Sequence, residues 1–177
     1  MEIVAIILIV LAIFIILEYN ICVRLRNKVK QAESSIDVYL NQRFDLIPNL
    51  VECVKGYKIY EERLLTKLVE KRNIYKDNPN LKEATDLNSE MLSLVGIAEG
   101  YPSIKANEQF LKLQEALTRM ESQLQAARRI YNGDVTVYNI KITSFPTNII
   151  AKIFNFREED LFEIEEYKKE LKIDFKG

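Results

Sequence analysis

Residues 110–142 read FLKLQEALTRMESQLQAARRIYNGDVTVYNIKI and contain the clearest pattern in the chain. Apolar residues recur there at alternating steps of three and four, which is the spacing of a coiled-coil seam. One stutter interrupts the spacing beside Gly133. The members of this stripe are Phe110, Leu113, Leu117, Met120, Leu124, Ala127, Tyr131, Val135, Tyr138 and Ile142. The pattern predicts one long helix packed against another helix, and Phe145-Pro146 is expected to end it.

A second stripe with the same spacing runs from Leu25 to Leu64. Arg43 stands there in place of one apolar member. Pro48 lies within the stripe, and a proline in the first turn of a helix costs no hydrogen bond. Because residues 43–45 contain no Gly to reverse the chain, we predict one long helix kinked near Pro48 rather than two helices that meet there.

Short turn signals divide the remainder of the chain. Asp77-Asn78-Pro79-Asn80 is expected to end the kinked helix, and residues 100–103 to end a shorter one. Acidic residues favour a helix N-terminus, so residues 158–160, Glu-Glu-Asp, predict the start of a last helix. The apolar residues 145–156 carry a single charge, Lys152. We expect them to lie either under the end of the bundle or on the bilayer surface.

These patterns define the fold class. The 177 residues include only five Gly and four Pro, too few for the frequent turns of a sandwich or barrel, and no convincing two-residue alternation is present. We predict an all-α protein, an antiparallel bundle of long helices on an N-terminal transmembrane helix. The expected division is a membrane anchor over residues 1–23, the bundle over residues 24–171 and a frayed tail over residues 172–177.

The N-terminal segment predicts membrane insertion. Ile3–Leu17 is an unbroken run of 15 apolar residues. Continued to Val23, it gives a helix of roughly 32 Å, against a hydrocarbon core of about 30 Å. A cleaved signal peptide fits less well, because Glu2 stands where a basic region should be. We therefore predict a single-pass protein of a cell membrane whose residues 1–30 contact lipid.

The basic residues after the apolar run predict the orientation of the chain. Arg24, Arg26, Lys28 and Lys30 follow the run, whereas only the amino terminus and Glu2 precede it. By the positive-inside rule the N-terminus is expected outside the cell and the bundle in the cytoplasm.

Composition excludes several functions. Lys and Arg number 25 against 26 Asp and Glu, so the net charge of −1 argues against a nucleic-acid partner. The absence of His removes imidazole bases, His-based triads and His-liganded metals, and two Cys do not make a zinc site by themselves. The clustered carboxylates are interpreted as solvated helix faces. No enzyme activity, metal or cofactor is expected.

Two blocks of sequence resemble the LemA family of bacterial membrane proteins. The first is Arg43–Val51, RFDLIPNLV, followed by Val54-Lys55-Gly56-Tyr57. The second comprises short motifs between Tyr101-Pro102 and Phe145-Pro146, among them residues 105–108, KANE, and residues 126–129, AARR. The resemblance covers about residues 19–167. It implies an N-terminal membrane helix and an all-helical bundle, and it supplies no catalytic residues.

Ten polar residues are the candidates for an interaction or structural role. A guanidinium at the seam position of Arg43 needs acceptors if it is buried, so we predict a pair with Glu108, Glu115 or Glu121 of another helix, or else extension of the side chain to water. Asn132 and Asn139 each follow a seam Tyr, seven residues apart, and would fix helix register or line a ligand groove. The candidates are Arg43, Asp45, Asn49, Lys55, Asn107, Glu108, Arg128, Arg129, Asn132 and Asn139.

The predicted function follows from the anchor and the seam. We expect a non-enzymatic, membrane-anchored protein that mediates protein–protein or protein–lipid interaction at the cell membrane. Its partners would be lipid, an unidentified membrane protein and further copies of itself in a homo-oligomer. The alternative is a membrane-tethered receptor or regulator that binds a peptide or small ligand in a bundle groove.

Overall fold

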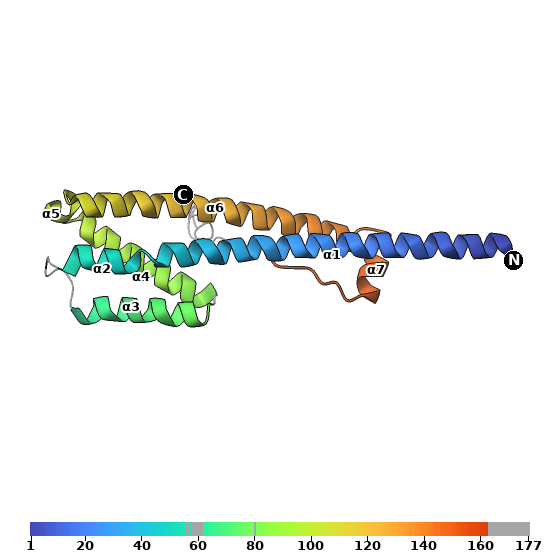
Figure 1. Cartoon of the computed structure of the whole chain (residues 1–177), viewed down its shortest axis with the longest axis horizontal. Helices are drawn as coiled ribbons and strands as arrows, with labels where there is room; N and C mark the ends of the chain where they lie inside the picture. The colour runs from blue at the N-terminus through green and yellow to red at the C-terminus, as the bar shows by residue number, and fades with distance from the viewer. Residues whose placement is uncertain (56, 58–61, 80, 163–177) are drawn as a thin grey trace, which may run out of the picture. The chain divides into compact units, whose positions relative to one another are not determined.

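The computed structural model describes all residues except 56, 58–61, 80 and 163–177, and within these limits it is all-helical with no strand. Seven helices follow one another along the chain (Figure 1). They are α1 (Glu2–Phe44), α2 (Ile47–Lys55), α3 (Glu62–Asp77), α4 (Leu81–Glu99), α5 (Pro102–Lys105), α6 (Glu108–Thr143) and α7 (Thr147–Ile153). The predicted all-α class with a long apolar N-terminal helix is confirmed.

The seam predicted from residues 110–142 is the buried face of α6. Eight of its ten members are buried, and Met120 and Tyr131 are half-buried. Gly133 lies on the exposed side, and the helix continues through it without a break. Tertiary packing on both sides of Gly133 therefore outweighs the cost of about 1 kcal/mol that a glycine adds in a helix interior.

The first half of the chain departs from the predicted single kinked helix. Helix α1 ends at Phe44, Asp45 and Leu46 form a two-residue turn, and α2 begins at Ile47. The chain does not reverse at this turn, but it reverses before α3, which packs against α2 (Figure 1). The prediction of one helix to Asp77 was therefore wrong.

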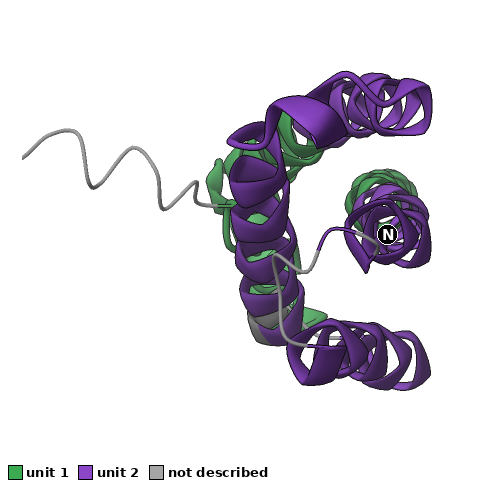
Figure 2. Ribbon diagram, turned by 90° about the vertical axis from the view of Figure 1, so that its left-hand side faces the viewer, with its two compact units in different colours: residues 1–33, 128–177 green, residues 34–127 purple. Residues whose placement is uncertain are grey.

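The structure divides into two compact units, which Figure 2 colours separately. Unit 2 comprises residues 34–127, and in it α2, α3 and α4 pack on one another. Phe44 and Tyr75 are fully buried there, with their rings edge to face at a centroid distance of 5.0 Å. Such aromatic pairs contribute about 0.5–1.5 kcal/mol beyond the area that they bury.

Unit 1 comprises residues 1–33 and 128–177. Its core joins α1 to the last part of α6, and residues from α7 onward complete it. The buried members are Cys22, Val29, Val135, Tyr138, Ile142, Ala151 and Phe156. These side chains hold the two long helices together in an antiparallel arrangement over this unit.

The segment after α7 contradicts one prediction. Residues 157–162 are not helical, so the acidic group at Glu158 does not begin a helix. The remainder of the predicted last helix and the predicted frayed tail lie outside the described residues. Of the apolar stretch 145–156, Ile150, Ala151 and Phe156 are buried, whereas Phe145, Ile149, Ile153 and Phe154 are exposed. Only a minority of this stretch is therefore covered by the protein.

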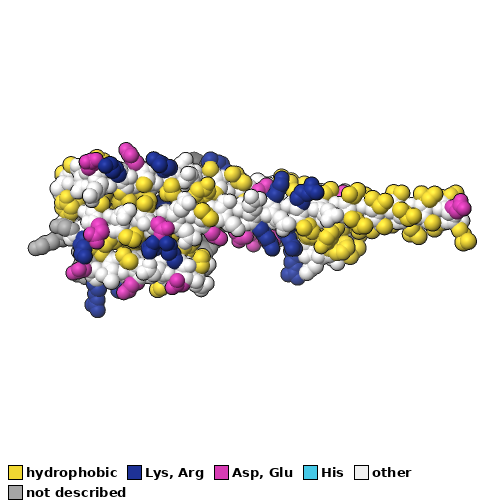
Figure 3. Space-filling view, viewed as in Figure 1, with side chains coloured by type: hydrophobic (Ala, Val, Ile, Leu, Met, Phe, Trp, Pro, Cys, Tyr) yellow, Lys and Arg dark blue, Asp and Glu magenta, His cyan; other side chains and the backbone are white. Residues whose placement is uncertain are grey.

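The N-terminal part of α1 is not covered by any described residue of its unit. Residues 1–17 are exposed apart from the half-buried Ile15, and Figure 3 shows apolar side chains along this end of the helix. The helix is long and apolar enough to cross a membrane. A soluble protein rarely leaves so large an apolar surface uncovered.

Candidate functional site: an extended segment bound on helix α6

The candidate site is a face of α6 that binds the main chain of residues 157–162. The Asn139 amide nitrogen donates to the Glu159 carbonyl oxygen at 2.8 Å, and the Glu159 N–H donates to Asn139 Oδ1 at 3.0 Å. Seven residues earlier on α6, Asn132 Nδ2 donates to the Phe162 carbonyl oxygen at 3.2 Å. The Phe162 N–H donates to Asn132 Oδ1 at 2.8 Å. Each Asn thus satisfies both main-chain polar groups of one residue.

Two tyrosines extend the same contact. The Tyr138 hydroxyl donates to the Arg157 carbonyl at 2.9 Å, and the Tyr131 hydroxyl donates to the Asp160 carbonyl at 3.0 Å. The structure therefore contains two successive Tyr-Asn pairs on α6, each of which holds main-chain groups of the segment. We call this face, Tyr131, Asn132, Tyr138 and Asn139, the Tyr-Asn clamp.

The spacing of the clamp matches the length of an extended chain. Seven residues of α-helix, the separation of Asn132 from Asn139, rise by roughly 10.5 Å. Three residues of extended chain, the separation of Glu159 from Phe162, span roughly 10 Å. The two tyrosines repeat this relation, because their acceptors on residues 157 and 160 are also three residues apart. A helix of the same segment would rise only about 4.5 Å over three residues and would lose this register.

An aromatic contact anchors the far end of the segment. The Phe162 ring meets Tyr131 edge to face at a centroid distance of 6.5 Å, and the Arg128 guanidinium lies 4.7 Å from the Phe162 centroid. A cation over an aromatic face contributes about 0.5–2 kcal/mol, depending on its exposure. This places Arg128, one of the sequence candidates, in the same site as the clamp.

The environment keeps the two hydroxyls protonated. Burial raises the pKa of Tyr138, and the Glu159 carboxylate raises it further. Burial also raises the pKa of Tyr131, with further contributions from Glu33, Glu159 and Asp160. Because a low-dielectric site and nearby negative charge both disfavour the phenolate, both groups remain hydrogen-bond donors at neutral pH.

The sequence pointed to only part of this site. Asn132 and Asn139 were singled out by their spacing, but the hydroxyls of the seam tyrosines and the ligand segment were not identified. The acidic residues 158–160 satisfy the local rule for a helix start, so the sequence predicted a helix where the chain is extended. The repeat Tyr-Asn at seven-residue spacing was the one available signal.

Arg43 forms the predicted pair with a carboxylate of another helix. Its guanidinium is buried in unit 2 and makes an ion pair and hydrogen bond with Glu121 of α6. Glu121 is one of the three glutamates expected from the sequence, whereas Glu108 instead pairs with Lys112 on the same helix at 2.7 Å. Arg43 therefore links α1 to α6 inside unit 2.

Asp45 fixes the turn between α1 and α2. Its carboxylate pairs with Arg72 and with Lys76, the latter at 2.5 Å, and Arg72 Nε donates to the Phe44 carbonyl at 3.2 Å. Burial raises the pKa of Asp45, but the hydrogen bonds from Lys76 and Arg72 lower it more, and the net pKa is below its usual value. This candidate has a structural contact within unit 2.

The remaining candidates lie at helix ends or on exposed faces. Asn107 caps α6, because its Oδ1 accepts the N–H of Gln109 at 2.8 Å and of Phe110 at 3.3 Å. Asn49 and Lys55 are exposed on α2, and Arg129 is exposed on α6. Arg43 belongs to unit 2 and the clamp to unit 1.

Comparison with known proteins agrees with this architecture. Protein LemA of Metamycoplasma hominis is 25% identical over 155 residues, which cover 85% of this chain and 71% of that protein. Magnetosome proteins MamQ 1 and MamQ 2 of Paramagnetospirillum magneticum are each 21% identical over 179 residues, covering 84% of this chain and 66% of theirs. With the apolar part of α1, these relatives indicate a membrane-associated helical protein. The model of the LemA family matches residues 32–175, most of the sequence, and the chain belongs to the LemA family.

Proposed function

We propose that this protein is a non-enzymatic, membrane-anchored interaction protein whose α6 face binds an extended polypeptide. The observation that carries the proposal is the Tyr-Asn clamp, in which six side-chain-to-main-chain hydrogen bonds hold residues 157–162. Main-chain groups are common to all polypeptides. The same face therefore suits an extended segment of another protein, with an aromatic residue for specificity.

In this proposal the chain's own segment is the resident ligand. Residues 157–161 are exposed on their outer side, and Phe162 is half-buried. The segment is held by side chains rather than by a continuous core, so it can leave without unfolding α1 or α6. A second copy or a membrane protein with a similar acidic-aromatic stretch would then compete for the clamp. This is the receptor-type form of the interaction function.

A peptide-binding measurement tests the proposal. The probe is a fluorescent peptide of residues 155–163, NFREEDLFE, and the acceptor is the full chain in detergent with Phe162→Ala, which weakens its own segment. We expect the peptide to bind this variant and to bind the parent chain more weakly. Adding Asn139→Ala should reduce affinity roughly ten- to thirtyfold, because two hydrogen bonds of about 1 kcal/mol each are lost.

The matched control is Arg129→Ala, an exposed side chain of the same helix, which should leave peptide affinity unchanged. Equal affinity of the Asn139→Ala and Arg129→Ala chains would contradict recognition by the clamp. Absence of any binding to the Phe162→Ala chain would contradict a peptide-binding role altogether.

We also propose that the N-terminus lies outside the cell and the helical units in the cytoplasm. The basic residues between Arg24 and Lys30 support this orientation. In intact cells, a membrane-impermeant maleimide should label Glu2→Cys, whereas Ser103→Cys should be labelled only after permeabilisation. The parent chain, with Cys22 buried and Cys53 half-buried, gives the background. Labelling of Ser103→Cys without permeabilisation would invert the orientation.

A further inference from the structure

An exposed apolar surface lies on α7 and its flanks. Phe145, Ile149, Ile153 and Phe154 are 80%, 53%, 70% and 47% exposed. The opposite side of the same helix, with Ile150 and Ala151, is buried against unit 1. Figure 3 shows the apolar side chains gathered over this helix. We call these four exposed residues the α7 patch. One side of α7 is thus covered by unit 1, and the other side is an uncovered apolar surface. An uncovered apolar surface of this kind marks an interaction site.

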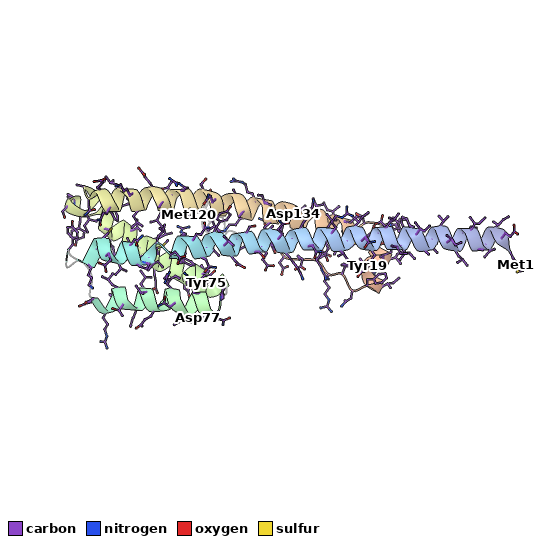
Figure 4. The ribbon with its side chains drawn as sticks, in the orientation of Figure 1. Met1, Tyr19, Tyr75, Asp77, Met120 and Asp134 are labelled. Atoms are coloured by element: carbon purple, nitrogen blue, oxygen red, sulfur yellow. The ribbon has the colours of Figure 1, made fainter. Side chains whose placement is uncertain are left out.

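Two contacts fix the position of α7 and its flank along α1, and a third, from Lys141 of α6, holds the same Glu18 carboxylate. Thr147 Oγ1 donates to Glu18 Oε2 at 2.9 Å, and Lys141 Nζ pairs with the same carboxylate oxygen at 2.8 Å. The Phe154 ring lies 4.8 Å from the Tyr19 ring, centroid to centroid. Figure 4 shows Tyr19 beside α7. The α7 patch is therefore held level with residues 18 and 19.

That level is the end of the apolar run of α1. The run ends at Leu17, and Glu18 is its first charged neighbour on this side. When the apolar run and the residues up to Val23 cross the bilayer, Glu18 and Tyr19 lie near the headgroup end of the span, where tyrosine is enriched. A helix fastened to these residues lies at the same depth. Apolar side chains of an interfacial helix insert there, between headgroups and acyl chains.

We propose that α7 is a second membrane contact, an interfacial helix whose α7 patch inserts into the leaflet from which α1 emerges. This inference rests on the membrane anchoring of α1 in the proposed function. The occupant is the bilayer surface rather than a second protein copy, because the patch is continuous in depth with the apolar span. Lys152, the single charge of α7, suits contact with lipid phosphate. Two attachments at one level would set the tilt of α1 and α6 against the membrane.

The absence of Trp from the chain makes the test direct. Four single-Trp variants of the full chain are reconstituted in phosphatidylcholine–phosphatidylglycerol vesicles that contain lipids brominated at shallow or deep acyl positions. Ile149→Trp probes the patch, and Phe154→Trp repeats the probe with a conservative aromatic change. Ile9→Trp reports insertion of α1. Ile130→Trp is the matched control, because Ile130 is 60% exposed on α6 and lies eleven residues, or roughly 16 Å, from Lys141.

We expect Ile149→Trp and Phe154→Trp to show blue-shifted emission and stronger quenching by shallow than by deep bromines. Ile9→Trp should be quenched more by deep bromines, and Ile130→Trp by neither. This inference would be overturned, with the anchor left intact, if Ile9→Trp is quenched while Ile149→Trp and Phe154→Trp behave like Ile130→Trp. A blue shift that depends on protein concentration without bromine quenching would overturn it in favour of contact between copies. No quenching of Ile9→Trp would overturn the anchoring itself, and the inference with it.

Discussion

Arg43→Ala should lower the free energy of unfolding by about 3 kcal/mol, a decrease in melting temperature of roughly 6–12 °C. Arg43 is 3% exposed, and its guanidinium pairs with Glu121, whose side chain is 36% exposed. Breaking a buried pair costs about 3–5 kcal/mol, and we expect the lower end because Glu121 can hydrate once its partner is removed. Urea unfolding of the full chain in detergent, followed by circular dichroism, measures the change.

The converse substitution should cost more. Glu121→Ala leaves the Arg43 guanidinium in its buried position without a carboxylate, and a guanidinium does not lose its proton to relieve this. The double variant Arg43→Leu/Glu121→Leu should return close to the parent stability, because apolar side chains often replace a buried pair without loss. The double-mutant cycle therefore isolates the coupling of the two residues.

The exposed pair Lys112–Glu108 is the matched control for Arg43. Its two side chains are 72% and 82% exposed, and Lys112→Ala should change stability by no more than about 0.5 kcal/mol. Should Arg43→Ala be as mild as Lys112→Ala, the Arg43–Glu121 pair would not stabilise unit 2.

Tyr138→Ala should destabilise unit 1 by about 3–5 kcal/mol, the cost of removing a fully buried aromatic side chain. Tyr138 is 0% exposed and packs in the core with Cys22 and Val135. Tyr138→Phe keeps the ring and loses only the hydrogen bond to the Arg157 carbonyl, which costs about 0.5–1.5 kcal/mol. Hydrogen exchange of the α6 amides reports the stability of this unit.

The two Tyr138 variants separate the contribution of ring packing in the core from that of the hydroxyl hydrogen bond in the clamp. Ile140→Ala, at an exposed position of the same helix, should lie within about 0.5 kcal/mol of the parent. Tyr138→Phe should increase proteolysis within residues 157–162 while leaving α6 protection nearly intact. A Tyr138→Phe chain that loses as much protection in α6 as Tyr138→Ala would show that the hydroxyl, rather than the ring, holds the core.

Local pattern was sufficient for the long elements of the fold. The stripe from Phe110 to Ile142 predicted α6 and eight of the ten positions on its buried face, because apolar residues at steps of three and four lie on one side of a helix. The apolar run before Glu18 predicted the exposed N-terminal part of α1 in the same manner. Its length and composition alone match a bilayer.

The sequence pattern gave no correct prediction where two different structures were equally compatible with it. The apolar stripe continued from α2 into α3 without a change of spacing. Two helices that pack on the same core can keep one periodic pattern, so the pattern did not reveal that the chain reverses between them. At Arg43 the sequence offered three glutamates as partners, and only the packing of α1 against α6 in unit 2 selected Glu121. Interhelical partners depend on register in space, which spacing along the chain does not determine.

The sequence by itself determined the helical class, most of the buried face of α6, the length and apolar character of the N-terminal part of α1, and the need of Arg43 for an acceptor if its side chain is buried. Only the tertiary structure decided that residues 157–162 are extended. By local rules the acidic residues 158–160 favour a helix start, a contribution of about 0.3–1 kcal/mol each. The clamp supplies six hydrogen bonds to the extended main chain, each worth about 1 kcal/mol. The contacts from distant residues therefore outweigh the local preference.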